Sequence, residues 1–172
     1  MHGTNLVAIV VALVPLTGCM SMPPVVKRGQ VPAGAEIAVI MFRDCVITGQ
    51  EDCDGSGNTA GSIFARTLAT GAHKAVPVSR PVDRKESLSD DAAVTYARSK
   101  GFRYVLNGEV DEYYRVAPFT YRAERAGISV RLLQVSDGAV VAFFSQRTHS
   151  ATNLTTPDKM IEAMAEHFRD SL

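Results

Sequence analysis

The sequence predicts an α/β fold, a two-layer sandwich with the element order β-α-β-α-β-β-β-α. In the first half of the chain, apolar runs of strand length alternate with amphipathic helical segments, which is typical of crossover units on a parallel sheet. In the second half, three strand-like segments follow one another, and a hairpin signal separates the last two. We therefore expect a mixed sheet that ends in an antiparallel meander and carries helices against it.

The first elements form a strand, a helix and a second strand. Residues 36–42 are a β-branched apolar run of buried-strand length. A polar loop follows, and then Asn58 or Thr59 can cap a helix over 58–72. A short strand is expected over 75–79. This order predicts the first crossover unit.

The second helix has clear signals at both ends. Ser89 is a suitable N-cap, and Asp90 and Asp91 place negative charge at the positive end of the helix dipole. Lys100 and Gly101 provide the cation and the glycine that are common where a helix ends. The sequence therefore predicts a helix that begins after Ser89 and ends near Lys100.

Three strands and a helix complete the predicted domain. Residues 103–116 and 128–133 alternate as strands do, with a protruding turn over 119–125 between them. The Ser-Asp-Gly triplet at 136–138 is a hairpin signal before the last strand, 139–146. These segments form the meander.

The final helix begins with Thr155 or Thr156 as its cap and Pro157 at its first position. Apolar residues then recur at three- and four-residue spacing, the pattern of a helix that lies on a sheet: Ile161, Met164, Phe168 and Leu172.

The amino-terminal region predicts a lipoprotein. Residues 6–16 are an apolar run too short to span a bilayer, and Leu16-Thr17-Gly18-Cys19 follows the pattern of a bacterial lipobox. We expect residues 1–18 to be a signal peptide and Cys19 to carry the lipid. Met20 is not the aspartate that favours retention at the inner membrane, so we expect the outer membrane.

The rest of the chain divides into a tether and one domain. Residues 19–35 are rich in proline and glycine, which predicts an extended tether. Residues 36–172 are enough for one domain with a core, which we expect in the periplasm. Lys and Arg number 18 and Asp and Glu number 18, so nothing in the charge predicts nucleic-acid binding.

Two cysteines remain after Cys19. Cys45 and Cys53 are expected to form a disulfide, because an exported protein meets oxidising conditions. The alternative is a zinc site, but no second cysteine pair or histidine lies at zinc-ligand spacing.

The loop after Cys45 has the alternating oxygen side chains of a calcium loop and a glycine in sixth place. Its candidate ligands are Asp52, Asp54, Ser56 and Asn58. The twelfth position is Ile63 and not the glutamate that completes such a shell. The alternative is a disulfide-braced turn that caps a helix, and we predict no metal or cofactor.

The sequence contains no nucleophile motif, so we predict no catalytic residues and no enzyme. Asp111 and Glu112 could be a carboxylate pair for sugar chemistry, although a solvated strand end is the favoured interpretation. Adjacent residues of a strand face opposite sides of the sheet, which separates the two carboxylates.

A mixed aromatic and arginine segment is the candidate contact surface, because both residue types are enriched in binding hot spots. The alternative is a partly buried hairpin whose arginine stems cover apolar surface. The segment contains Tyr113, Tyr114, Arg115, Phe119, Tyr121, Arg122 and Arg125.

The element order behind a lipobox resembles the small envelope lipoproteins that share the fold of the TolB amino-terminal domain, such as PelC, LpoB and CsgG. The resemblance is carried by 101–145, with GFRYVLNGEVDEYYRV, AGISVRLLQV, an SDG turn and AVVAFFS. The run DGSGNTAGSIFARTLATG is also similar to an uncharacterised lipoprotein family with Gly-Ser-Gly before its first helix.

The resemblance implies a non-catalytic interaction or assembly module of the cell envelope, of the polysaccharide-export or secretion accessory type. Its expected partners are the membrane through the lipid, a periplasmic or outer-membrane protein, and further copies of the chain. The alternatives are an activator of a periplasmic cell-wall synthase and, at lower weight, a periplasmic enzyme or ligand-binding module.

Overall fold

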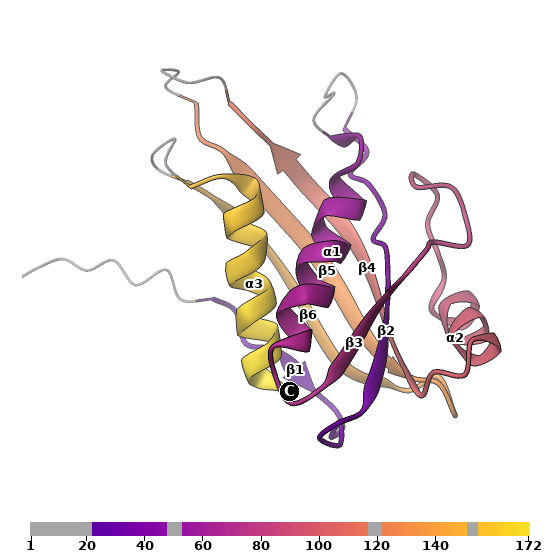
Figure 1. Cartoon of the computed structure of the whole chain (residues 1–172). Coiled ribbons are helices and arrows are strands. Elements are labelled where there is room, and N and C mark those ends of the chain that lie inside the picture. Colours follow the sequence, from indigo (N-terminus) through magenta and orange to yellow (C-terminus); the bar gives the residue numbers. More distant parts are fainter. Residues whose placement is uncertain (1–21, 48–52, 117–121, 151–154) are drawn as a thin grey trace, which may run out of the picture.

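The computed structural model describes residues 22–47, 53–116, 122–150 and 155–172. Within these ranges a mixed sheet of six strands has the order β1-β6-β5-β4-β2-β3 (Figure 1). The predicted order of eight elements is confirmed, and β1 is an additional strand. The bounds are β1 Val26–Lys27, β2 Glu36–Ile40, α1 Ser56–Ala69, β3 Lys74–Val78, α2 Asp90–Ser99, β4 Tyr104–Tyr114, β5 Arg125–Gln134, β6 Val140–His149 and α3 Pro157–Ser171.

The sheet is parallel on one side and antiparallel on the other, as the sequence predicts. Strand β2 pairs in parallel with both β3 and β4, so α1 and α2 lie in crossover connections. Strands β4, β5 and β6 pair antiparallel in sequence order and form the meander.

The two faces of the sheet are covered unequally. Helices α1 and α3 lie side by side over one face, and α2 covers one end of the opposite face (Figure 1). Neighbouring residues of β4 show the alternation, because Leu106 packs in the larger core under α1 and α3 and Val105 packs in the smaller core under α2. Much of the second face is therefore left without a covering helix.

Phenylalanine rings connect the elements of the larger core. Phe42, just after β2, lies 5.1 Å from Phe64 of α1, measured between ring centroids. Phe64 lies 6.1 Å from Phe168 of α3, and Phe168 lies 6.4 Å from Phe144 of β6. Tilted ring pairs at such distances stabilise a core beyond the burial of their area. The rings thus join α1 and α3 to the parallel half of the sheet at Phe42 and to its antiparallel half at Phe144, within one core.

The predicted caps of α2 and α3 are confirmed. The Ser89 hydroxyl accepts the Ala92 N–H at 3.2 Å, and the Thr156 hydroxyl accepts the Lys159 N–H at 3.4 Å with Pro157 in the first turn. None of the helices in the described ranges has the length and apolar character needed to cross a membrane.

The second half of the segment 19–35, which the sequence predicts to be a tether, packs on the domain. Strand β1 pairs antiparallel with β6, so that Val26 lies opposite Phe143. Val31 is buried, and the Gly34 N–H donates to the Ala72 carbonyl at 2.6 Å. Proline and glycine correctly indicate an extended chain, but an extended chain with valines can also pair as an edge strand.

The opposite edge of the sheet is blocked by a proline. Lys74 N–H donates to Ala35 O and Val78 O accepts from Met41 N–H, so these two positions of β3 face β2. Because the backbone groups of successive strand residues point to opposite sides, those of Pro77 point to the free edge of β3, and proline has no N–H to offer there. A proline in this position costs no hydrogen bond of the sheet and hinders the addition of a further strand.

The contact between Gly108 and Phe42 gives a test of the core. A Cβ at Gly108 of β4 would lie 2.6 Å from Cδ1 of the Phe42 ring. We expect Gly108→Ala to lower the free energy of unfolding by about 1–3 kcal/mol, measured by urea denaturation, because the ring is packed against Phe64 and cannot move freely. Combining it with Phe42→Leu should recover part of the loss relative to Phe42→Leu alone. Unchanged stability of Gly108→Ala would contradict this packing.

Candidate functional site

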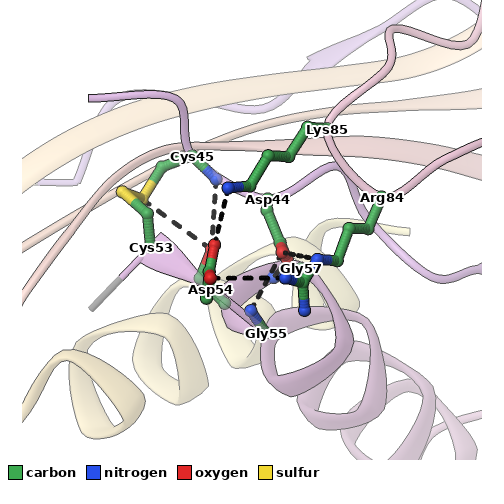
Figure 2. The surroundings of a disulfide bond; sticks show 9 residues. Asp44, Cys45, Cys53, Asp54, Gly55, Gly57, Arg84 and Lys85 are labelled. Atoms are coloured by element: carbon green, nitrogen blue, oxygen red, sulfur yellow. Dashed lines mark hydrogen bonds and ion pairs between the residues drawn. A yellow bond between two sulfur atoms is a disulfide. The ribbon is translucent and has the colours of Figure 1, made fainter. Parts of the chain in front are cut away.

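The loop before α1 is closed by a disulfide. Cys45 and Cys53 are bonded, with their Cα atoms 5.0 Å apart, and both are buried (Figure 2). The predicted bridge is thus present. It places Asp44 and the first residues of α1 next to one another.

Asp44 caps α1 from a distance in the sequence. Gly55, at the N-cap, has φ 85° and no capping side chain. Instead, the Asp44 carboxylate accepts the Gly55 N–H at 2.9 Å and the Gly57 N–H at 2.7 Å (Figure 2). Its negative charge also lies at the positive end of the helix dipole. The expected cap at Asn58 or Thr59 is wrong, because sequence signals detect only caps supplied by neighbouring residues.

A second loop closes over this corner. The Asp44 side chain is 1% exposed and lies 3.5 Å from the Arg84 Nε. Asp54 lies 2.8 Å from Lys85 Nζ and 3.3 Å from Arg84 Nη2 (Figure 2). The hydrogen bond and the charge of Lys85 lower the pKa of Asp54, with a further contribution from Arg84. These ion pairs therefore connect the loop before α1 with the loop that carries Arg84 and Lys85.

These contacts leave little for a calcium shell. Asp54 is engaged by Lys85, and the buried Ser56 hydroxyl accepts the Cys45 N–H at 3.1 Å and contacts Cys45 Sγ at 3.8 Å. Asn58 is exposed, and Asp52 lies outside the described residues. In the part of the chain that the structure describes, no three His, Cys, Asp or Glu residues gather as metal ligands do. The geometry favours the braced turn.

The candidate contact surface is divided between the two faces of the sheet. Tyr113 is 4% exposed and lies on the face of α3, where its hydroxyl hydrogen-bonds the Asp158 carboxylate. Arg115 Nη2 donates to the Tyr113 hydroxyl and to Asp158 Oδ2, both at 2.7 Å. Its burial removes Tyr113 from the candidate contact surface and agrees with the alternative of a partly buried hairpin; the sequence does not reveal which face α3 covers.

The other predicted contact residues lie apart from this cluster. Arg122 donates to the Tyr114 hydroxyl at 3.2 Å, and Arg125 pairs with Glu112 at 3.2 Å. Phe119 and Tyr121 lie outside the described residues, as does the lipidation candidate Cys19.

Glu124 is a site residue that the sequence did not indicate. It is 6% exposed, and its Oε2 has no hydrogen-bond partner among the described residues. Burial raises the pKa of Glu124; Arg115 opposes this shift and Asp158 adds to it. Together with Tyr113 these groups form a polar cluster at the start of α3.

A bulge in β4 changes the expected geometry of the carboxylate pair. The register shifts between Val110 and Glu112, so Asp111 is an extra residue. A Cβ at Gly127 would lie 3.4 Å from Cβ of Asp111 and 3.3 Å from Cβ of Glu112. Both carboxylates therefore face the same side, and the expectation of opposite faces was wrong because a bulge interrupts the alternation.

The capping carboxylate can be tested by removing its charge. Asp44→Asn keeps one acceptor oxygen but loses the second acceptor and the charge facing Arg84 and the helix dipole. We expect the free energy of unfolding to fall by about 1–3 kcal/mol in thermal denaturation. Asp54→Asn is the matched control, since its ion pairs are exposed and should matter little. Equal effects of the two variants would contradict the assignment of Asp44 as the cap.

The Tyr113 cluster predicts a loss of stability at alkaline pH. Burial and the hydrogen bond to Asp158 raise the pKa of Tyr113 to about 12, against the effect of Arg115. The phenol of the unfolded chain has a pKa near 10. As pH rises from about 10 to 12, the unfolded state loses the proton first, so stability should fall over this interval. Tyr113→Phe should flatten this dependence, measured by denaturation across pH with phenolate absorbance as the readout of ionisation. The same slope in Tyr113→Phe would assign the effect to other groups.

Comparison with known proteins identifies the fold. No family model and no curated protein matches the chain. Among solved structures, the PelC dodecamer from Paraburkholderia phytofirmans aligns with 25% identity over 83% of this chain and 91% of PelC, at a TM-score of 0.60. The LpoB C-terminal domain from Salmonella enterica has 17% identity, with 71% and 86% covered and a TM-score of 0.45. Lipoprotein GNA1162 from Neisseria meningitidis has 14% identity, with 81% and 99% covered and a TM-score of 0.47. The chain therefore shares the fold of PelC, as its sequence pattern predicts.

Proposed function

We propose that this chain is an outer-membrane lipoprotein whose α/β domain works in the periplasm as a non-catalytic interaction or assembly module of the cell envelope. In this proposal residues 1–18 are the signal peptide, Cys19 carries the lipid, and the domain follows a short tether. The observation that carries the proposal is the likeness to PelC, which covers 83% of this chain and 91% of PelC. The lipobox adds independent support from the sequence.

We extend the proposal to self-assembly, because the PelC structure is a dodecamer. A closed ring requires two different surfaces on each copy, one of which receives the other. The described edges of the sheet, β1 and β3, differ in length and neighbours, and Pro77 hinders pairing at β3. Side chains, and not an added strand, would then make the contacts between copies.

The same likeness supports a proposal for the type of assembly. We favour an accessory of the polysaccharide-export or secretion type, in which the domain contacts a periplasmic or outer-membrane protein. The alternative, an activator of a cell-wall synthase, remains a prediction from the sequence resemblance.

The anchor and the assembly can be tested with the same material. Cys19→Ser should abolish incorporation of labelled palmitate and release the chain from the membrane fraction, because it removes the acylated thiol. The Cys45→Ser, Cys53→Ser double variant is the control and should keep the label. Label that persists in Cys19→Ser would contradict the anchor.

Self-assembly is tested by mass photometry of the chain extracted in detergent. We expect one discrete species much larger than the 18.5 kDa chain. A monomer at every concentration would contradict the ring and leave only the simpler interaction module.

A further inference from the structure

The part of the sheet face that α2 does not cover contains a cavity. It lies at the carboxyl ends of β4 and β6 and the amino end of β5. Its volume is about 320 Å³. It lies beside the bulge of β4, where Arg125 of β5 is opposite His149 of β6 and Gly127 is opposite Arg147. Its lining contains three nitrogen-rich side chains and one carboxylate: Glu112, Ala123, Arg125, Arg147, Thr148 and His149.

Gly127 gives Arg147 its position. A Cβ at Gly127 would lie 2.8 Å from Cγ of Arg147, so any other residue would displace the Arg147 stem from β5. The aliphatic part of the Arg147 side chain therefore lies over Gly127 of β5, the middle strand of the meander. Glu112 of β4 is on the other side of Gly127, because the same Cβ added at Gly127 would lie 3.3 Å from the Cβ of Glu112.

The charges of the cavity are incompletely paired. Arg125 Nη1 lies 3.2 Å from Glu112 Oε1, and this pair neutralises one cation and the one carboxylate of the lining. The Arg147 side chain has no hydrogen bond or ion pair with any residue that the structure describes. Among the described residues, the cavity therefore retains one guanidinium whose N–H donors are unpaired, and His149 also lines it.

This arrangement fits a single carboxylate. A guanidinium binds a carboxylate through two parallel N–H···O bonds, and one unpaired cation balances one negative charge. A phosphate group near neutral pH carries a charge of about −1.5 to −2, which is more than one unpaired cation balances. Among the described residues of the lining there is no Phe, Tyr or Trp ring against which a sugar could stack. The chemistry thus favours an acidic side chain of a protein over phosphate or an acidic sugar.

We infer that this cavity is a receptor for an acidic side chain of a protein partner, with Arg147 as the residue that binds the carboxylate. The inference rests on the proposed function only in taking the partner to be a protein. It adds the chemistry of the partner and the place where it docks.

The inference is tested by NMR titration of the purified full chain in detergent with the peptide acetyl-Gly-Glu-Gly-amide. The matched peptide acetyl-Gly-Gln-Gly-amide has the same shape without the charge. We expect saturable shifts of the amides of Arg125, Arg147 and His149 with the glutamate peptide, and binding about tenfold weaker with the glutamine peptide. Equal binding of the two peptides would overturn the inference.

Two variants assign the binding to Arg147. Arg147→Gln should weaken binding of the glutamate peptide by about tenfold, whereas Arg28→Gln should not change it. Arg28 is likewise exposed, and its side chain makes no hydrogen bond or ion pair with the described residues. Unchanged binding in Arg147→Gln would overturn the assignment.

Inorganic phosphate and galacturonate serve as competitors that distinguish the ligand source. If either bound more tightly than the glutamate peptide, the assignment to a protein side chain would be wrong. These titrations do not depend on Cys19 or on assembly, so they can fail while the anchor and the ring are confirmed, and the reverse also holds.

Discussion

The position of α1 depends on one buried carboxylate. Asp44 accepts two N–H groups at the start of the helix, and it is held there by the disulfide from the neighbouring Cys45 and by Arg84 above it. A buried carboxylate is costly unless its oxygens are hydrogen-bonded and its charge is compensated, and here both conditions are met. Because α1 carries Phe64, this one group also fixes the ring contacts toward β2 and α3.

The elements were predictable because their signals are local. Period-two and period-3.6 patterns, the Ser89 and Thr156 caps and the Ser-Asp-Gly turn each depend on residues within a few positions. The cap of α1, the burial of Tyr113 and the pairing of β1 were not predictable in this way. Each depends on a contact between distant parts of the chain, such as the hydrogen bond from Tyr113 to Asp158. The bulge at Asp111 was not predicted either, because the alternation of residues along β4 does not show where an extra residue interrupts the pairing with β5.

The two faces of the sheet use their polar groups differently. Under α3, Tyr113, Arg115 and Asp158 satisfy one another and fasten the helix to β4. On the open face, by contrast, the bulge gathers carboxylates beside arginines, and Gly127 admits a side chain from the next strand. The segment 113–125 thus contributes side chains to both faces: Tyr113 and Arg115 stabilise the contact with α3, and Arg125 lines the cavity on the open face. Because these residues are close in the sequence, they resemble a single surface there.

The early docking of the amino-terminal segment has a consequence for how the domain could move. The Pro23 carbonyl lies 3.0 Å from His167 Nε2 of α3, and Lys27 Nζ lies 3.2 Å from the Leu172 carbonyl. For a chain anchored at Cys19, as proposed, only the four peptide steps from 19 to 23 separate the lipid from the first contact with the domain. Fully extended, four residues reach about 14 Å. Such a short linker would hold the domain close to the bilayer surface and limit its rotation. A partner would therefore contact the domain in a restricted range of orientations.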